Sequence, residues 1–162
     1  MITIYSEKHR LRNPKTELFG GIFVNPFENP SRVDVILKRL EGEKLGEIKE
    51  PTEFSIESVI AVHDKKFVEF LKVAWEEWNK TKNKGEVIPS CWPARRMSMK
   101  IPNNIEGMVG YYSMASETSI SRGTWEAAVS SKDVALTGAE ILLREKKNGG
   151  QIFMMISLNY TT

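Results

Sequence analysis

The sequence predicts an α/β fold in which helices flank a small parallel sheet of about three strands. Two apolar runs of strand length, residues 2–5 and residues 152–156, lie near the two ends of the chain. The second run is continuously apolar, as is typical of a strand buried on both faces of a parallel sheet. Amphipathic helical segments lie between the runs, and this alternation favours α/β architecture.

Irregular structure is expected on both sides of the first of these helices. Residues 15–30 contain the pair Gly20-Gly21 and two prolines, which favour a loop without regular structure. Residues 44–49 can form a further short strand.

The first helix is predicted from Asn29 to Gly42. Asn29 can cap free N–H groups, and Pro30 suits the first helical position. Apolar residues then recur on one helical face until Gly42 can end the helix. This face comprises Val33, Ile36, Leu37 and Leu40.

The strongest amphipathic pattern follows Asp64, which we expect to cap its helix after a smaller helix that starts near Ser55. The apolar face of this helix comprises Phe67, Phe70, Leu71, Ala74, Trp75 and Trp78. Thr124 is expected to cap a last helix, which runs to about residue 146. The face that it turns toward the sheet is predicted to comprise Trp125, Ala128, Ala135, Ala139 and Leu142.

Residues 82–122 are predicted to form a long ordered loop, because the first half shows neither helical nor alternating periodicity. Structureless loops beyond about 12–15 residues are uncommon unless they are functional or disordered. Disorder is not expected, because apolar residues of the segment can be buried. These are Ile88, Trp92, Ile101, Ile105, Met108, Val109 and Tyr111. We therefore expect the loop to pack on itself, on a partner or around a ligand.

The composition is ordinary for one soluble domain that spans residues 1–162, with 41% hydrophobic and 27% charged residues. The net charge is only +2 and the Lys and Glu residues are interspersed, so neither nucleic acid nor an anionic membrane is an expected partner. The single Cys91 excludes an internal disulfide and suits a reducing compartment. With neither a signal peptide nor a long apolar run in the sequence, we expect a cytoplasmic protein.

Five stretches together resemble, in the right order, the amino-terminal part of the acetylpolyamine amidohydrolases of the zinc-dependent histone deacetylase superfamily. They are KTELFGG, FENPSRVDVIL, VHDKKFVEFL, IPNNIEGMVGYY and SETSISRGTWEAAVSS. The resemblance covers roughly residues 1–143 and implies part of an arginase/deacetylase fold. In that family the whole sheet is parallel and eight-stranded, and the long loop builds a homodimer that narrows the active-site channel. Residues 144–162, a predicted strand and tail, depart from the family pattern.

The motifs that supply zinc ligands in this family are missing from the sequence. The strand that should run into a Pro-Pro-Gly-His-His segment reads QIFMMISLNYTT, and no Asp-x-His pair occurs. The histidines are His9 and His63, and His63-Asp64 matches a helix-start motif of the family for which capping or packing is expected. Catalytic zinc needs at least three protein ligands and a general base. We therefore expect no catalytic residue, metal site or cofactor, and no enzyme activity of this chain alone.

Of the family's properties, the resemblance still allows this chain to recognise a cation through acidic side chains. Glu17, Glu106 and Glu117 stand where the family places acidic side chains near the channel mouth. Such carboxylates attract an ammonium group, most strongly where water is excluded. For each of them, an ordinary solvated surface role remains the alternative.

These observations favour a truncated, non-catalytic deacetylase-like protein that acts as an interaction module or binds small cations such as polyamines. One alternative is half of a split zinc-dependent deacetylase that another polypeptide completes. Another is a folded remnant with no selected role. We also expect a homo-oligomer, at least a dimer, formed through residues 82–122, through the exposed strand at residues 151–158, or through both.

Overall fold

The computed structural model describes residues 1–94, 96, 98–145 and 152–154. Three short strands form a parallel sheet in the order β4-β1-β5, which confirms the predicted fold class. The strands are β1 (Ile2–Ile4), β4 (Glu47–Lys49) and β5 (Ile152–Met154). Ile4 stands opposite Lys49 on one side and Met154 on the other. In the described part of the chain, no helix is both long and apolar enough to cross a bilayer.

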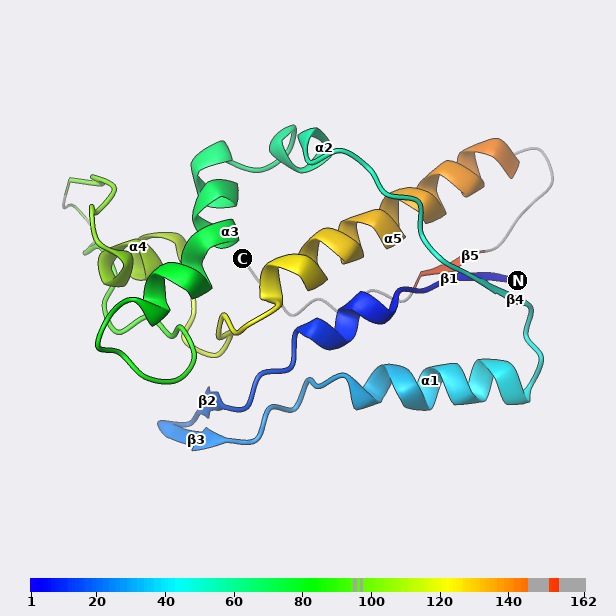
Figure 1. The fold of residues 1–162 in the computed structure, drawn as a ribbon, viewed down its shortest axis with the longest axis horizontal. Coiled ribbons are helices and arrows are strands. Elements are labelled where there is room, and N and C mark those ends of the chain that lie inside the picture. Colours follow the sequence, from blue (N-terminus) through cyan, green and yellow to red (C-terminus); the bar gives the residue numbers. More distant parts are fainter. Residues whose placement is uncertain (95, 97, 146–151, 155–162) are drawn as a thin grey trace.

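Two helices lie on opposite sides of this sheet (Figure 1). They are α1 (Ser31–Gly42) and α5 (Thr124–Glu145). On the α1 side, Tyr5, Val33 and Leu40 form a buried cluster. Ile36 was predicted to belong to the buried face of α1, but it is 37% exposed. The predicted apolar stripe of α1 is therefore wider than the surface that the helix buries.

The end of α1 agrees with the prediction, and its first residue, Ser31, lies one position after the predicted first helical residue, Pro30. The side-chain oxygen of Asn29 accepts a hydrogen bond from the backbone N–H of Ser31 at 3.1 Å, and Pro30 directly precedes the helix. The helix ends at Gly42 as predicted.

A hairpin replaces the irregular loop that was predicted for residues 15–30. Its antiparallel strands are β2 (Glu17–Phe19) and β3 (Ile22–Val24). Gly20 and Gly21 connect them with φ values of 58° and 83°. A type I′ hairpin turn, whose twist matches that of the strands, needs positive φ at both central positions, which glycine adopts without strain. The Gly-Gly pair was thus a hairpin signal.

A second core lies away from the sheet, around α3 (Lys65–Asn79). Asp64 caps this helix as predicted, because its carboxylate accepts hydrogen bonds from the backbone N–H groups of Lys66 and Phe67 at 2.8 and 3.0 Å. The buried members of this core are Phe70, Ala74, Trp78, Val87, Val109 and Ile120. The predicted apolar face of α3 is confirmed. A short helix, α2 (Glu57–Ile60), precedes α3.

The buried face of α5 differs from the predicted one. Ala139 is exposed, Leu142 is 36% exposed and Trp125 is only partly buried. The buried residues of this helix are instead Thr124, Ala127, Ser130, Ser131, Asp133, Val134 and Thr137. Thr124 is the first residue of α5, and its hydroxyl accepts a hydrogen bond from the backbone N–H of Ser121 at 3.0 Å.

Polar partners explain why α5 buries this face. The Asp133 carboxylate accepts the backbone N–H of Phe54 at 2.8 Å, and the Thr137 hydroxyl accepts that of Thr52 at 2.9 Å. The Ser130 hydroxyl donates to that of Ser6 at 2.8 Å, next to a short 3-10 helix, η1 (Glu7–Leu11). Buried polar groups are stable when they are hydrogen-bonded, so hydrophobicity alone did not identify the inward face.

Candidate functional site

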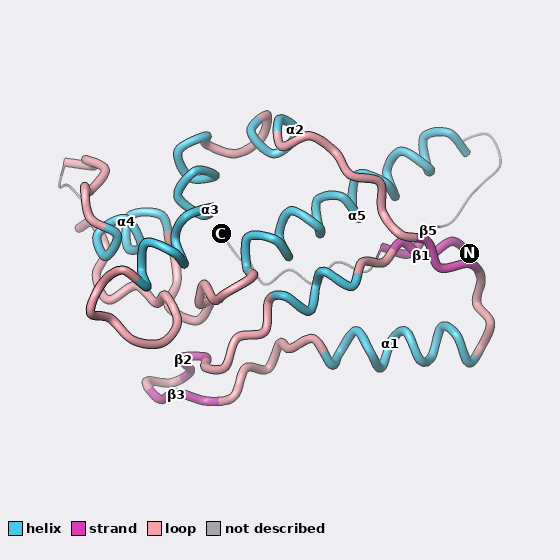
Figure 2. Tube along the Cα trace, in the orientation of Figure 1, coloured by secondary structure: helices cyan, strands magenta, loops and turns pink. Residues whose placement is uncertain are grey.

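The described residues between 82 and 122, which are 82–94, 96 and 98–122, lie at one end of the molecule beyond α3 (Figure 1), and many of them are loop (Figure 2). The two ends of this segment meet at an isolated antiparallel bridge between Val87 and Ile120. Each backbone N–H donates to the carbonyl of the other residue, at 2.9 and 3.0 Å. Both side chains are buried in the α3 core, so the base of the segment is anchored there.

Glu86 joins this base to the hairpin. Its carboxylate accepts hydrogen bonds from the backbone N–H of Lys15 at 2.7 Å and from the hydroxyl of Ser119 at 3.0 Å. It also accepts the backbone N–H and the hydroxyl of Thr16, at 3.2 and 2.9 Å. Two segments distant in sequence, residues 15–16 and the stretch at Ser119, thus converge on this one carboxylate. No local pattern in the sequence marks Glu86, because its partners are all far along the chain.

The second half of the segment contains a helix that was not predicted, α4 (Ile105–Tyr112). Asn104 caps it, since its side-chain oxygen accepts the backbone N–H of Gly107 at 2.7 Å. The sequence did contain the signal, because apolar or aromatic residues recur at helical spacing after this Asn. They are Ile105, Met108, Val109 and Tyr112.

Close packing holds the first half of the segment against α4. A Cβ on Gly110 would lie 1.7 Å from the carbonyl oxygen of Cys91, so only glycine permits this approach. The indole N–H of Trp92 donates to the carbonyl of Ser113 at 2.7 Å. The ring of Tyr112 stacks on Phe70 of α3 with centroids 4.8 Å apart. The aromatic residues of the segment therefore have packing roles.

The three acidic residues of the candidate cation site lie on different elements. Glu17 is half-buried in β2, and its carboxylate accepts the backbone N–H of Phe27 at 3.0 Å. Glu106 is exposed in the first turn of α4 and accepts the side-chain N–H of Asn83 at 2.6 Å. Glu117 is exposed on the connection between α4 and α5.

Metal ligands do not converge in the described part of the chain, where no group of three or more His, Cys, Asp or Glu side chains could hold an ion. His9 is buried, with Nδ1 2.9 Å from the carbonyl of Ser6. His63 is exposed next to the cap of α3. The donor set that the structure describes therefore does not fit the zinc site that the resemblance implies.

A network of charges ties η1 to α1. Arg10 donates from Nε to the carboxylate of Glu7 at 2.6 Å and from a terminal nitrogen to that of Asp34 at 3.0 Å. The hydrogen bonds from Arg10 hold the pKa of the Asp34 carboxyl below its ordinary value. This network joins η1 to α1 at the surface of the molecule.

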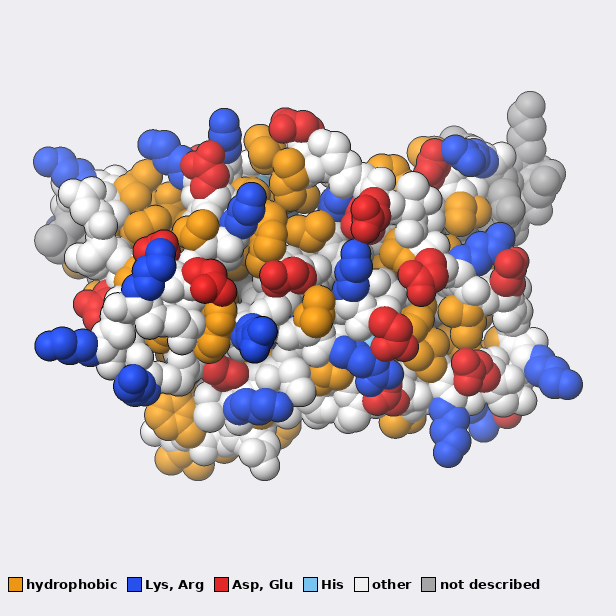
Figure 3. Space-filling view, in the orientation of Figure 1, with side chains coloured by type: hydrophobic (Ala, Val, Ile, Leu, Met, Phe, Trp, Pro, Cys, Tyr) orange, Lys and Arg blue, Asp and Glu red, His pale blue; other side chains and the backbone are white. Residues whose placement is uncertain are grey.

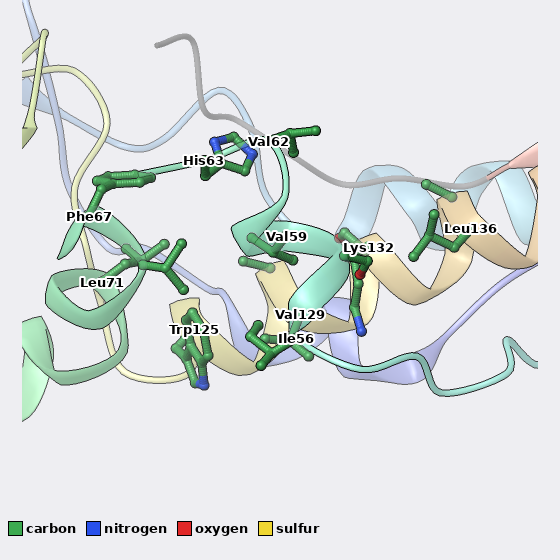
Figure 4. A pocket seen from close by; sticks show the side chains of 15 residues that line it. Ile56, Val59, Val62, His63, Phe67, Leu71, Trp125, Val129, Lys132 and Leu136 are labelled. Carbon is green, nitrogen blue, oxygen red and sulfur yellow. The ribbon is translucent and has the colours of Figure 1, made fainter. Parts of the chain in front are cut away.

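An apolar groove that the sequence did not predict runs between α2, the start of α3 and the first half of α5 (Figure 4). Its volume is about 490 Å³. We call it the α2–α3–α5 groove. It is lined by Ile56, Ser58, Val59, Val62, His63, Phe67, Val68, Leu71, Trp125, Ala128, Val129, Ser131, Lys132, Ala135 and Leu136. Trp125, Ala128 and Ala135 of α5 were predicted to face the sheet, but they line this groove.

Comparison with known proteins accounts for this architecture. Residues 26–156 match the histone deacetylase domain. The chain is 46% identical over 142 residues to an acetylpolyamine amidohydrolase of Mycoplana ramosa, covering 88% of this chain and 42% of that protein. It is 44% identical over 138 residues to acetylpolyamine amidohydrolase 2 of Pseudomonas aeruginosa, covering 85% of this chain and 40% of that protein.

The fold has a match among solved structures. The crystal structure of an acetylpolyamine aminohydrolase from Burkholderia pseudomallei superposes with a TM-score of 0.77 at 21% identity, over 93% of this chain and 42% of that one. This chain thus spans about two fifths of the length of the relatives that it matches. The match over residues 26–156 and the two close relatives show that the chain belongs to the histone deacetylase family.

Proposed function

We propose that this chain is a non-catalytic deacetylase-like module that binds small organic cations of the polyamine class. The observation that supports it is the position of Glu17, Glu106 and Glu117 in the hairpin and in the described residues of the segment 82–122, which lie toward the same end of the molecule. The Mycoplana ramosa and Pseudomonas aeruginosa relatives are named for acetylpolyamines, which carry ammonium groups along an aliphatic chain.

The placement of the carboxylates suits a long, flexible cation better than a compact one. Because they lie on β2, on α4 and on the connection between α4 and α5, each can meet a different ammonium group. The hydrogen bonds from Phe27 and Asn83 orient Glu17 and Glu106 and still leave carboxylate lone pairs free.

The expected affinity is low. A pair of charges 4 Å apart gains about 1 kcal/mol in bulk water and about 4 kcal/mol near a protein surface, before the cost of ordering the ligand. Two or three such contacts at exposed side chains correspond to dissociation constants in the region of about 1 mM to tens of micromolar. Salt should weaken this binding, because exposed charges are screened.

We also propose that the module is a homodimer formed through residues 82–122, as the resemblance implies. A dimer would exclude water around the carboxylates and so strengthen their attraction for a cation. The second predicted surface, at residues 151–158, lies outside the described residues except for residues 152–154. Light scattering during size-exclusion chromatography should give about twice the chain mass of 18.5 kDa, and a clean monomer would contradict the dimer.

The test of cation binding is calorimetric titration of the metal-free protein with spermidine and N-acetylated polyamines at low salt. Saturable heat should be lost in a Glu106→Gln/Glu117→Gln variant and weakened in Glu17→Gln. Glu76→Gln removes an equally exposed carboxylate from the solvent side of α3 and serves as the matched control. Binding that survives in the double variant, or no heat at millimolar ligand, would overturn the proposal.

A further inference from the structure

The carboxylate of Glu106 is held by an uncharged donor. The side-chain nitrogen of Asn83 lies 2.6 Å from one of its oxygens, Oε1. Because a carboxylate can only accept, the amide nitrogen must donate this hydrogen bond. Asn83 is half-buried, whereas Glu106 is exposed in the first turn of α4. One oxygen of an exposed carboxylate is thus engaged within the protein.

Asn83 is itself anchored to the end of α3. Its backbone N–H donates to the Thr81 hydroxyl at 3.1 Å, and that hydroxyl donates to the carbonyl of Trp78 at 2.7 Å. Trp78 is buried in the α3 core. A side chain at a binding site keeps one orientation when packing and hydrogen bonds fix the residues that support it. Asn83 therefore connects Glu106 to the core at this end of the molecule.

Charge compensation distinguishes Glu106 from other exposed carboxylates of this chain. The carboxylate of Glu77, for example, lies 2.7 Å from the ammonium group of Lys80. Acidic and basic side chains are interspersed over the face that Figure 3 shows. Among the residues that the structure describes, no ion pair includes Glu106, and its hydrogen-bond donor is the neutral amide of Asn83. A neutral donor orients a carboxylate without cancelling its charge, so Glu106 can still attract an external cation.

The engaged oxygen also restricts which cations this carboxylate can bind well. A guanidinium group prefers two parallel N–H···O hydrogen bonds, one to each carboxylate oxygen. An ammonium group is a compact charge that a single oxygen can satisfy. Because the Asn83 amide already donates to Oε1 of Glu106, a guanidinium must compete for that oxygen. An ammonium can bind at Oε2 alone.

We propose that Asn83 is a positioning residue that makes Glu106 selective for ammonium over guanidinium cations. Asn83 acts through the carboxylate and need not touch the ligand. The same hydrogen bond should raise the affinity for an ammonium, since a carboxylate that is already ordered loses less freedom on binding. This inference rests on the proposed cation binding and adds the chemical class of the group that Glu106 binds.

Calorimetric titration at low salt with 1,4-diaminobutane and 1,4-diguanidinobutane tests the selectivity, because the two probes share their aliphatic chain and their charge. The unaltered chain should bind the diamine at least about threefold more tightly. In Asn83→Ala the diamine should bind about two- to tenfold more weakly, because Glu106 is no longer ordered beforehand. The diguanidine should bind at least as tightly as before, because both oxygens are then free. The ratio of the two dissociation constants is the readout, since a general loss of structure would weaken both.

Two further variants serve as controls. Asn79→Ala removes an exposed amide at the end of α3 that donates to the carbonyl of Trp75, and it should leave the ratio unchanged. Asn83→Lys replaces the neutral donor with an ammonium that can pair with Glu106 inside the protein. Binding of both probes should then fall to the level of Glu106→Gln. Circular dichroism should show all of these variants folded.

The possible outcomes separate this inference from the proposed function. If the unaltered chain binds the diamine but Asn83→Ala keeps the same ratio, cation binding stands and the role of Asn83 is refuted. Tighter binding of the diguanidine by the unaltered chain would refute it as well, as would undiminished binding in Asn83→Lys. If neither probe binds the unaltered chain, the proposed cation binding fails and this inference fails with it.

Discussion

Glu86 and Thr16 are joined by two hydrogen bonds, although 70 positions separate them in the sequence. One carboxylate oxygen of Glu86 accepts both the backbone N–H and the hydroxyl of Thr16. Thr16 directly precedes β2, and Glu86 directly precedes the bridge that closes residues 82–122. This contact therefore sets the position of Glu17 relative to the segment that carries Glu106 and Glu117.

Replacement of Glu86 by Gln should destabilise the protein by about 1–3 kcal/mol, because an amide has one acceptor oxygen where the carboxylate serves four donors. Urea unfolding monitored by tryptophan fluorescence would measure the loss. Glu126→Gln, at an exposed position of α5, should change stability by less than about 0.5 kcal/mol. Equal stability of the two variants would show that the Glu86 contacts contribute nothing.

Alanine at Gly110 should separate the first half of the loop segment from α4. The added Cβ would collide with the Cys91 carbonyl, and such overpacking typically costs about 1–3 kcal/mol. Gly42→Ala is the control, because nothing lies within 4 Å of a Cβ at that position. It should leave stability unchanged or raise it by up to about 1 kcal/mol. Thermal unfolding of both variants checks this, and an unaffected Gly110→Ala would refute the close packing.

Loss of the Asp64 cap should weaken α3 by about 0.5–2 kcal/mol in Asp64→Ala, since two backbone N–H groups would lose their acceptor. Asp64→Asn should retain most of the stability, because an amide oxygen caps about as well as a carboxylate. Chemical denaturation of the two variants distinguishes capping from charge. If Asn were as damaging as Ala, the negative charge rather than the hydrogen bonds would be responsible.

The Arg10–Asp34 contact should make stability depend on pH in the acid range. Hydrogen bonds from Arg10 lower the pKa of the Asp34 carboxyl in the folded state, so its contribution is complete above the ordinary pKa of about 3.9 and is lost as pH falls through the lowered value. The difference in unfolding free energy between pH 6 and pH 2.5 should therefore be smaller in Arg10→Met than in the unaltered protein. The effect should be modest, because the groups are exposed to solvent screening.

Lys38→Met provides the control for this pH experiment, since it removes a positive charge from an exposed position of the same helix, α1. Its difference between pH 6 and pH 2.5 should equal that of the unaltered protein. A flattening of the same size in both variants would assign the effect to net charge instead of to the Asp34 and Glu7 carboxyls, both of which accept hydrogen bonds from Arg10.

Local chemistry in the sequence was sufficient for the elements whose signals lie within one turn of the chain. The cap and the apolar face of α3 and the boundaries of α1 follow from residues that contact one another along the same helix. The parallel sheet was predictable for a related reason, because strands buried on both faces are continuously apolar. The hairpin and α4 carried equally local signals, but Gly20-Gly21 was interpreted as part of an irregular loop and Asn104 was not recognised as a helix cap.

Only the tertiary structure decided the features that depend on distant partners. The buried face of α5 is polar because Asp133 and Thr137 accept hydrogen bonds from a segment about 80 positions earlier, so hydrophobic periodicity misassigned it. The hydrogen bonds to Glu86 and the α2–α3–α5 groove likewise arise where distant segments of the chain meet. Those segments share no local sequence pattern. The sequence alone thus determined the fold class, the family resemblance and the acidic residues. Their relative placement and the open apolar surface were set by long-range packing, which no short stretch of sequence encodes.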